Sequence, residues 1–214
     1  MARNKYPEET VQKILDVSMK LFMEKGFEET TVLDIVNNLG GLTRGAFYHH
    51  FKSKEEVLDA LGDRMFYDNN PFEKVKKEKD LNGLEKIRQV VRFQHQNQDQ
   101  QEMNLMSISL VDNPKIFTEF FESNQKVIAP LFEELIREGI KDGSIKGVKY
   151  PKAFASFFVL ITDIWLVPSI VPGSHDELLE KLYFAKDTFE KLGVPIIDDE
   201  MLESTKELID RIGK

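Results

Sequence analysis

The sequence has no cysteine and few histidines, so it lacks the side chains on which disulfide-rich proteins and many metalloenzymes depend. Without cysteine, neither a disulfide framework nor a thiolate metal site can form, which fits a reducing compartment. Its four histidines, at positions 49, 50, 95 and 175, are too scattered to suggest a zinc enzyme. We therefore expect a cytoplasmic protein that uses no metal and no cofactor.

A membrane-crossing segment is also missing. The basic residues Arg3 and Lys5 are not followed by the apolar stretch of a secretory signal. One apolar run, residues 153–171, approaches spanning length, but Asp163 lies at its centre. A charged residue there would cost about 2.5–3.5 kcal/mol on insertion scales. A helix covered by protein explains this run better, so we expect no membrane partner.

Strand-like alternation is absent, and helical signals take its place almost throughout. The chain of 214 residues, 41% of them hydrophobic, can bury a substantial core. Capping boxes, prolines and glycines divide it at helical lengths. The sequence therefore predicts an all-α fold. Beyond the N-terminal part, helices are expected over roughly 83–99, 103–111, 115–142, 151–167, 175–192 and 199–212.

Three short helices separated by tight turns are predicted near the N-terminus. Their bounds follow from caps and stops, at Pro7 to Gly26, Thr31 to Leu39, and Thr43 to about Phe51. A capping box at Ser53 opens a fourth helix. Three helices in this order suit a helix-turn-helix unit, whose third helix enters the DNA major groove.

The third helix and its flanks gather groups that suit contact with DNA. Thr43 offers a hydroxyl for a phosphate, and Arg44 can reach a phosphate or a guanine edge. Small residues at the helix start allow close approach to the bases. The further candidates are Gly45, Ala46, Tyr48, His49, His50 and Lys54, with Phe47 and Phe51 as inward anchors. These residues could instead be ordinary helix caps and a solvated aromatic surface.

An ordered motif runs through residues 14–58. It contains IL at 14–15, LFMEKGF at 21–27, TTV at 30–32, DI at 34–35, Gly40, and LTRGAFYHHFKSKEE at 42–56. This order resembles the N-terminal domain of the TetR family of transcriptional regulators. The resemblance implies backbone contacts from Thr31, Tyr48, His50 and Lys54, and base contacts from Arg44, Gly45, Ala46 and His49.

The chain departs from the family pattern in one turn. Where the family commonly has a single glycine between the second and third helices, this sequence has Gly40 and Gly41. The extra residue should lengthen the turn. Base specificity therefore cannot be carried over from relatives with the shorter turn.

The net charge of −8 is unusual for a protein that binds a polyanion. Residues 1–54 are nearly balanced, with 8 basic and 7 acidic residues. A local basic face can nevertheless suffice, and its candidates are Arg3, Lys5, Arg44, Lys52 and Lys54. If Lys54 neutralises one phosphate, its removal should lower the log–log salt slope of DNA binding by about 0.9.

The second part of the chain carries two kinds of candidate. Apolar helices with isolated polar groups suggest a small-molecule pocket, although the same residues could simply be core. The pocket candidates are Phe93, His95, Met103, Met106, Phe117, Phe120, Phe121, Phe158, Thr162 and Trp165. Asp163 would need a partner, either in an interface network or in a cationic ligand.

Assembly is the second expectation for this part. The predicted helix at 151–167 is apolar nearly all round, and residues 178–192 carry an apolar seam with a mean spacing of about 3.5, as in helix bundles. A second copy could cover both, although a central helix in a monomer would also explain the first. The interface candidates are Phe154, Phe157, Leu160, Ile164, Leu178, Leu182, Ala185 and Phe189.

Together these features predict a DNA-binding domain over 1–66 and a helical ligand-binding and dimerisation domain over 67–214. We expect a homodimeric regulator that binds a palindromic operator in double-stranded DNA, with repression relieved by a small-molecule effector, as the resemblance implies. Two alternatives remain, a dimeric protein-interaction module that no longer reads DNA, and an enzyme using a cavity of the helical domain. No metal-site, phosphate-loop or nucleophile-elbow spacing supports the enzyme.

Overall fold

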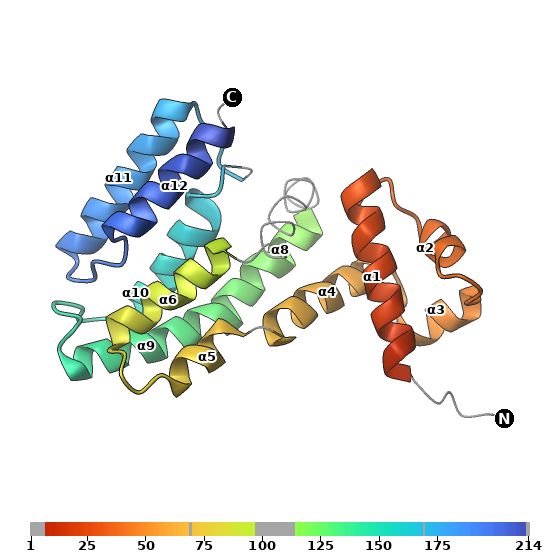
Figure 1. The fold of residues 1–214 in the computed structure, drawn as a ribbon, viewed down its shortest axis with the longest axis horizontal. Coiled ribbons are helices and arrows are strands. Elements are labelled where there is room, and N and C mark those ends of the chain that lie inside the picture. Colours follow the sequence, from red (N-terminus) through yellow and green to blue (C-terminus); the bar gives the residue numbers. More distant parts are fainter. Residues whose placement is uncertain (1–6, 69, 97–113, 169, 213–214) are drawn as a thin grey trace. The chain divides into compact units, whose positions relative to one another are not determined.

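The computed structural model describes residues 7–68, 70–96, 114–168 and 170–212, and within these ranges all regular structure is helical (Figure 1). The all-α prediction is therefore confirmed. The elements are α1 (Pro7–Lys25), α2 (Val32–Asn38), α3 (Arg44–His50), α4 (Lys54–Asp68), α5 (Pro71–Lys77), α6 (Gly83–Gln96), α8 (Pro114–Ser123), η1 (Asn124–Ile128), α9 (Ala129–Asp142), α10 (Pro151–Leu160), η2 (Ile161–Trp165), α11 (His175–Lys191) and α12 (Asp199–Ile212).

The chain divides into two compact units. One contains α1 to α4 and the first three residues of α8, and the other begins at Pro71 with α5 and resumes at Phe117. In the first unit, α1 packs against α2 and α4, and α2 contacts α3. Figure 1 shows α2 and α3 on the same side of α1. The core between them is apolar, and Ile14, Ile35 and Phe47 have no exposed surface. The tight packing of this core fixes the orientation of α3 relative to α1 and α2.

Polar contacts reinforce the first unit. The Arg64 guanidinium on α4 lies 2.7 Å from the Asp16 carboxylate of α1 and 2.9 Å from the Gln12 side-chain oxygen. Thr30 is buried, and its hydroxyl donates to the carbonyl of Gly26 over 2.7 Å. These bonds hold α4 and the loop after α1 against the α1 helix.

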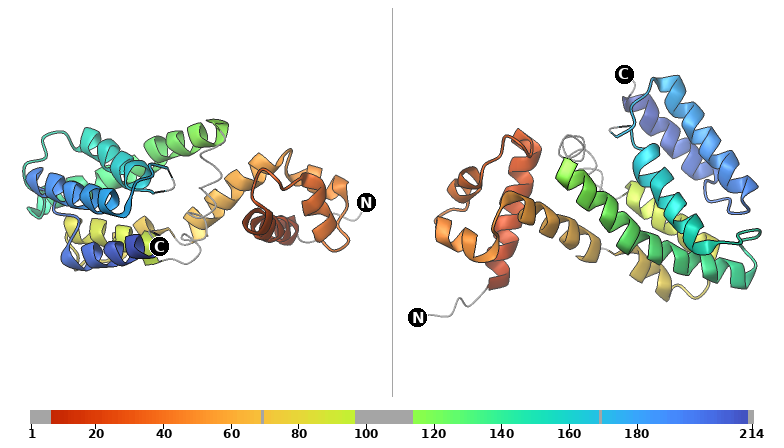
Figure 2. Two further views of the ribbon diagram at one scale, coloured as in Figure 1. Left: turned by 90° about the horizontal axis from the view of Figure 1, so that it is seen from above. Right: turned by 180° about the vertical axis from the view of Figure 1, so that it is seen from behind.

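The second unit is built around α9, which packs against α6 and α10. The α6 and α9 backbones approach closely because Gly83 faces Gly139. Beside this crossing, the backbone N–H of Gly83 donates to the Asp142 carboxylate over 2.7 Å, so the end of α9 caps the start of α6. Helices α11 and α12 lie side by side, as both views of Figure 2 show.

The helices predicted over 115–142 and 151–167 are both present, but neither is α-helical along its whole length. Each contains a five-residue π-helical segment, η1 in the first and η2 at the end of the second. Such segments insert one extra residue into a helical turn and often occur at functional sites. The helix predicted over 103–111 lies outside the described residues.

Helix α5 is a difference from the sequence-based prediction, which placed no helix over residues 71–77. Pro71 sets the first turn, and Phe72 and Val75, three residues apart, are buried against the unit's core. The sequence pattern did not predict this helix, because these two apolar residues lie next to or among the charged residues 73–80. Among the described helices, none combines the length and apolar character that crossing a bilayer needs.

Candidate nucleic-acid interface

Helix α3 is held by two aromatic anchors and turns its other side outward. Phe47 has no exposed surface and Phe51 is 7% exposed, so both inward positions were predicted correctly. Residues on the opposite side are accessible, and Arg44, Gly45 and His49 are exposed. Tyr48 is 44% exposed, while Ala46 is partly buried. The helix therefore presents a small polar surface with a fixed orientation.

The two threonine caps differ in their capacity to donate to a phosphate. The Thr43 hydroxyl accepts from the backbone N–H of Ala46 over 3.2 Å, which leaves its own proton free to donate outward. The Thr31 hydroxyl instead donates to the Asp34 carboxylate over 2.7 Å, as does its backbone N–H over 2.9 Å. Both donors of Thr31 are thus engaged in the capping box.

Asp34 also places a negative charge at the start of α2. Its pKa is lowered to about 2, chiefly by the hydrogen bond from the Thr31 backbone, with further contributions from the Thr31 hydroxyl and Lys25. The Lys25 ammonium lies 3.0 Å from the carboxylate. This carboxylate is therefore ionised at neutral pH, and it holds the two Thr31 donors that a phosphate would need.

Arg44 and Tyr48 form one surface at the start of α3. The Arg44 guanidinium carbon lies 5.5 Å from the centre of the Tyr48 ring, within cation–π range. Neither side chain has an acidic partner among the described residues, so the guanidinium keeps its full positive charge outward. A guanidinium held in this way suits bidentate bonding to a guanine edge or to a phosphate.

His49 and His50 lie with their ring centres 5.0 Å apart and approach edge to face. The pKa of His50 is lowered, first by partial burial and second by the neighbouring His49. At neutral pH the ring is therefore uncharged and can donate or accept a hydrogen bond, but it adds no positive charge.

Lys54 lies in a position that its sequence motif did not reveal. Its ammonium group donates to the backbone carbonyls of Phe27 and Glu28, over 2.7 and 3.0 Å. It also lies 4.4 Å from the centre of the Phe27 ring, and its side chain is only 18% exposed. Lys54 thus ties the start of α4 to the loop after α1, and its donors are largely used within the protein.

Of the remaining basic candidates, Lys52 is accessible, with a side chain that is 89% exposed. Its ammonium lies 3.9 Å from the Glu56 carboxylate, which reduces the field that it can offer a phosphate. Arg3 and Lys5 lie outside the described residues.

The candidates for a small-molecule pocket whose side chains the structure describes lie in different surroundings. Phe158 is buried in the core, where its ring contacts those of Phe132 and Phe189. Phe120 and Phe121 are more than one third exposed, and Phe117, Thr162 and Trp165 are partly buried. His95, Met103 and Met106 lie where the structure describes no side chain.

An open groove with a volume of about 640 Å³ does lie in the second unit, between α6 and the start of α12. Of the pocket candidates, it includes Phe93 alone. Its other lining residues are mostly charged, namely Leu81, Glu85, Arg88, Gln89, Arg92, Asp198 and Glu200. Arg88 and Arg92 pair with Asp198 across it, an ion-pair arrangement that the sequence pattern did not indicate.

The apolar seam of α11 serves the protein's own core. Leu178, Leu182, Ala185 and Phe189 are at most 6% exposed within one chain, and Phe154, at 8%, packs its ring against Phe189. Because these five residues are already covered, they are not available to a second copy in this arrangement. The other interface candidates differ: Phe157 is 39% exposed, and Leu160 and Ile164 are partly exposed.

Sequence reasoning missed the exposed aromatic side of α11. Phe184 is 61% exposed, and its ring lies 5.8 Å from that of Trp165, centre to centre. The seam that repeats every three or four residues identifies which side of α11 is buried. Tyr183 and Phe184 fall outside that repeat, which was the available signal that they face elsewhere.

The short capped helices α2 and α3, joined by a tight turn and buttressed by α1, define a helix-turn-helix domain. Residues 14–61 match the family described as "Bacterial regulatory proteins, tetR family". The N-terminal domain of the chain is therefore a helix-turn-helix domain of this family.

Curated relatives are similar in sequence to this chain over the N-terminal domain. YerO of Bacillus subtilis, described as an uncharacterized HTH-type transcriptional regulator, is 41% identical over 76 residues, which are 35% of this chain and 25% of that protein. The HTH-type transcriptional repressor KstR2 of Mycobacterium tuberculosis is 45% identical over 49 residues, 23% of this chain and 24% of that protein. The matches to these relatives thus span about a quarter of their length.

Solved structures extend the similarity to the whole fold. A transcriptional regulator from Cytophaga hutchinsonii has a TM-score of 0.58 at 17% identity, covering 96% of this chain and 95% of that chain. A putative TetR/AcrR-family regulator has a TM-score of 0.55 at 21% identity, covering 95% and 100%. Both structures have the fold seen here, in which an N-terminal helix-turn-helix domain is followed by a larger helical domain.

Proposed function

We propose that this chain is a transcription repressor that binds a palindromic operator as a homodimer and is released by a small-molecule effector. The observation that carries the proposal is the outward surface of α3. There Arg44 and Tyr48 have no acidic partner among the described residues, and the anchors Phe47 and Phe51 fix the helix. KstR2, a relative with the same domain in several organisms, is named a repressor, which favours repression over activation.

Within this surface we assign roles according to the free hydrogen-bonding capacity of each group. Arg44 and His49 read base edges, with Gly45 and Ala46 allowing close approach. Thr43, Tyr48 and His50 bind the phosphate backbone. Thr31 and Lys54 act mainly by holding the loop and helix ends in place, because their donors are engaged within the domain.

The domain assignment, with DNA binding by residues 1–66 and ligand binding and dimerisation by 67–214, remains part of the proposal. The division into two compact units near residue 70 supports it. Two copies of α3 must lie about 34–36 Å apart to enter successive major grooves. The exposed aromatic residues of the second unit, Phe157 on α10 and Phe184 on α11, suit the contact between copies.

An effector would act by binding more tightly to the dimer geometry that does not fit the operator. The open groove between α6 and the start of α12 is one place where an effector can bind, and its charged lining favours a ligand that carries charged groups. The partly buried Asp163 of η2, whose pKa is raised to about 6 by its apolar surroundings, offers a second point at which a cationic ligand could act.

Selection of duplexes from a random-sequence pool tests this function. We expect enrichment of one palindrome with half-sites about one helical turn apart, and binding of one dimer to each duplex. Failure to enrich any sequence, even at low salt, would favour the protein-interaction module instead. A compound library screened for release of the enriched duplex would then identify the effector class.

A further inference from the structure

Most of the positive charge around the helix-turn-helix is neutralised by nearby carboxylates. Between residues 7 and 54 the chain has six cationic side chains, apart from histidine. Four of them lie within 4.0 Å of a carboxylate, the pairs being Lys20–Glu24, Lys25–Asp34, Lys52–Glu56 and Lys54–Glu28. Of these six side chains, all of which the structure describes, Lys13 and Arg44 have no carboxylate within 4.0 Å.

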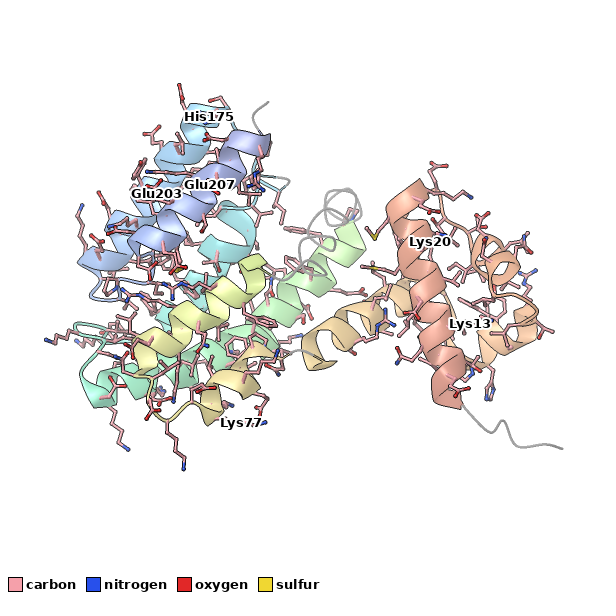
Figure 3. The ribbon with its side chains drawn as sticks, in the orientation of Figure 1. Lys13, Lys20, Lys77, His175, Glu203 and Glu207 are labelled. Carbon is pink, nitrogen blue, oxygen red and sulfur yellow. The ribbon has the colours of Figure 1, made fainter. Side chains whose placement is uncertain are left out.

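These two charges lie near the same turn. Lys13, on α1, extends towards the turn between α2 and α3, and its ammonium nitrogen lies 3.5 Å from where a Cβ atom on Gly40 would be. Figure 3 labels this side chain on α1. The same turn leads three residues later into Thr43, the cap of α3, which is followed by Arg44.

The turn itself leaves room for a close approach. Gly40 and Gly41 both have positive φ values, 60° and 98°, which residues with a side chain rarely adopt. Both glycines are exposed, and a Cβ on Gly41 would meet nothing within 4 Å. A phosphate group can therefore approach the Lys13 ammonium without meeting a side chain from the turn.

We propose that Lys13 and the Gly40–Gly41 turn form an additional contact site for a DNA phosphate, beside the bases that α3 reads. This inference rests on the proposed function and adds to it a residue outside the helix-turn-helix motif. An ammonium group is a compact charge that binds phosphate without directional demands, so it strengthens binding to any sequence. It also explains how a unit with little net charge retains a positive edge at its recognition helix.

The test compares Lys13→Gln with Lys20→Gln, on the enriched duplex and on a scrambled duplex. Lys20 lies seven residues further along α1 and is 73% exposed, but it is paired with Glu24, so it controls for loss of one α1 charge. Binding constants are measured against salt between about 50 and 200 mM, where phosphate contacts dominate the slope. Lys13→Arg, which keeps the charge, serves as a rescue variant.

We expect Lys13→Gln to lower the salt slope by about 0.9 for each bound protomer, on both duplexes alike. Lys20→Gln should leave it within error of the unchanged protein, and Lys13→Arg should restore it. An unchanged slope in Lys13→Gln, with the parent protein still binding its duplex, would overturn the Lys13 contact alone. If the parent protein selects no duplex, the proposed function itself fails.

Discussion

Replacing Lys54 by methionine separates a positioning role from a phosphate contact. The sequence motif predicts a phosphate contact, whose loss should lower the salt slope by about 0.9. In the structure, the ammonium group instead donates to the carbonyls of Phe27 and Glu28, and only 18% of the side chain is exposed. We therefore expect Lys54→Met to destabilise the N-terminal unit and to leave the salt slope unchanged.

The size of the effect follows from the two hydrogen bonds. A hydrogen bond from a charged donor contributes about 1.5–3 kcal/mol, and water can replace part of it at a partly exposed site. Methionine keeps the apolar contact with the Phe27 ring, so the expected loss is about 1–3 kcal/mol in the free energy of unfolding. Urea denaturation followed by helical circular dichroism measures this loss.

Lys52→Met is the matched control, because Lys52 is two residues away and 89% exposed. Its removal should change the unfolding free energy by less than about 0.5 kcal/mol. The positioning role of Lys54 is refuted if Lys54→Met unfolds like the parent protein but shows a salt slope reduced by one phosphate. Measuring both quantities on one preparation distinguishes the two roles.

Three further predictions test separate parts of the molecule. Gly83→Ala would bring a Cβ within 2.2 Å of the Gly139 backbone nitrogen, so it should cost about 3 kcal/mol of unfolding free energy or more. Gly62→Ala, in open space on α4, should be neutral or slightly stabilising, and equal effects would contradict the close helix crossing. A phosphate near His50 would favour its protonated form, whose pKa is lowered in the free protein. DNA affinity should therefore rise as pH falls below about 6.5, and His50→Gln should remove that rise in a pH titration. If the proposed dimer forms through the exposed Phe184, Phe184→Glu should give a folded monomer in sedimentation experiments, and a dimer that persists would exclude this face.

Local signals predicted much of the fold. Threonine caps at 31 and 43, and glycines at the ends of helices, act within a few residues, so the bounds of α2 and α3 follow from the sequence. The inward anchors of α3 follow from their spacing of four residues. Helix α5 was missed because its two buried apolar residues lie within a highly charged stretch.

Contacts between distant residues could not be predicted in this way. The bonds that Lys54 donates to the loop after α1 span 26 and 27 residues, and the bond that the Gly83 N–H donates to Asp142 spans 59. Periodicity identified the apolar seam of α11, but not whether the chain's own helices or a second copy cover it. The position of the Lys13 ammonium beside Gly40 likewise depends on how α1 packs next to the turn between α2 and α3.

The most direct test of the DNA-reading surface is the ratio of affinities for the enriched and scrambled duplexes, measured at one salt concentration before and after Arg44→Ala. If Arg44 bonds to a base edge, the ratio should fall about 10- to 100-fold, corresponding to about 1–3 kcal/mol of discrimination. A ratio that is large in the parent protein and unchanged in Arg44→Ala would show that this surface of α3 does not read the bases through Arg44.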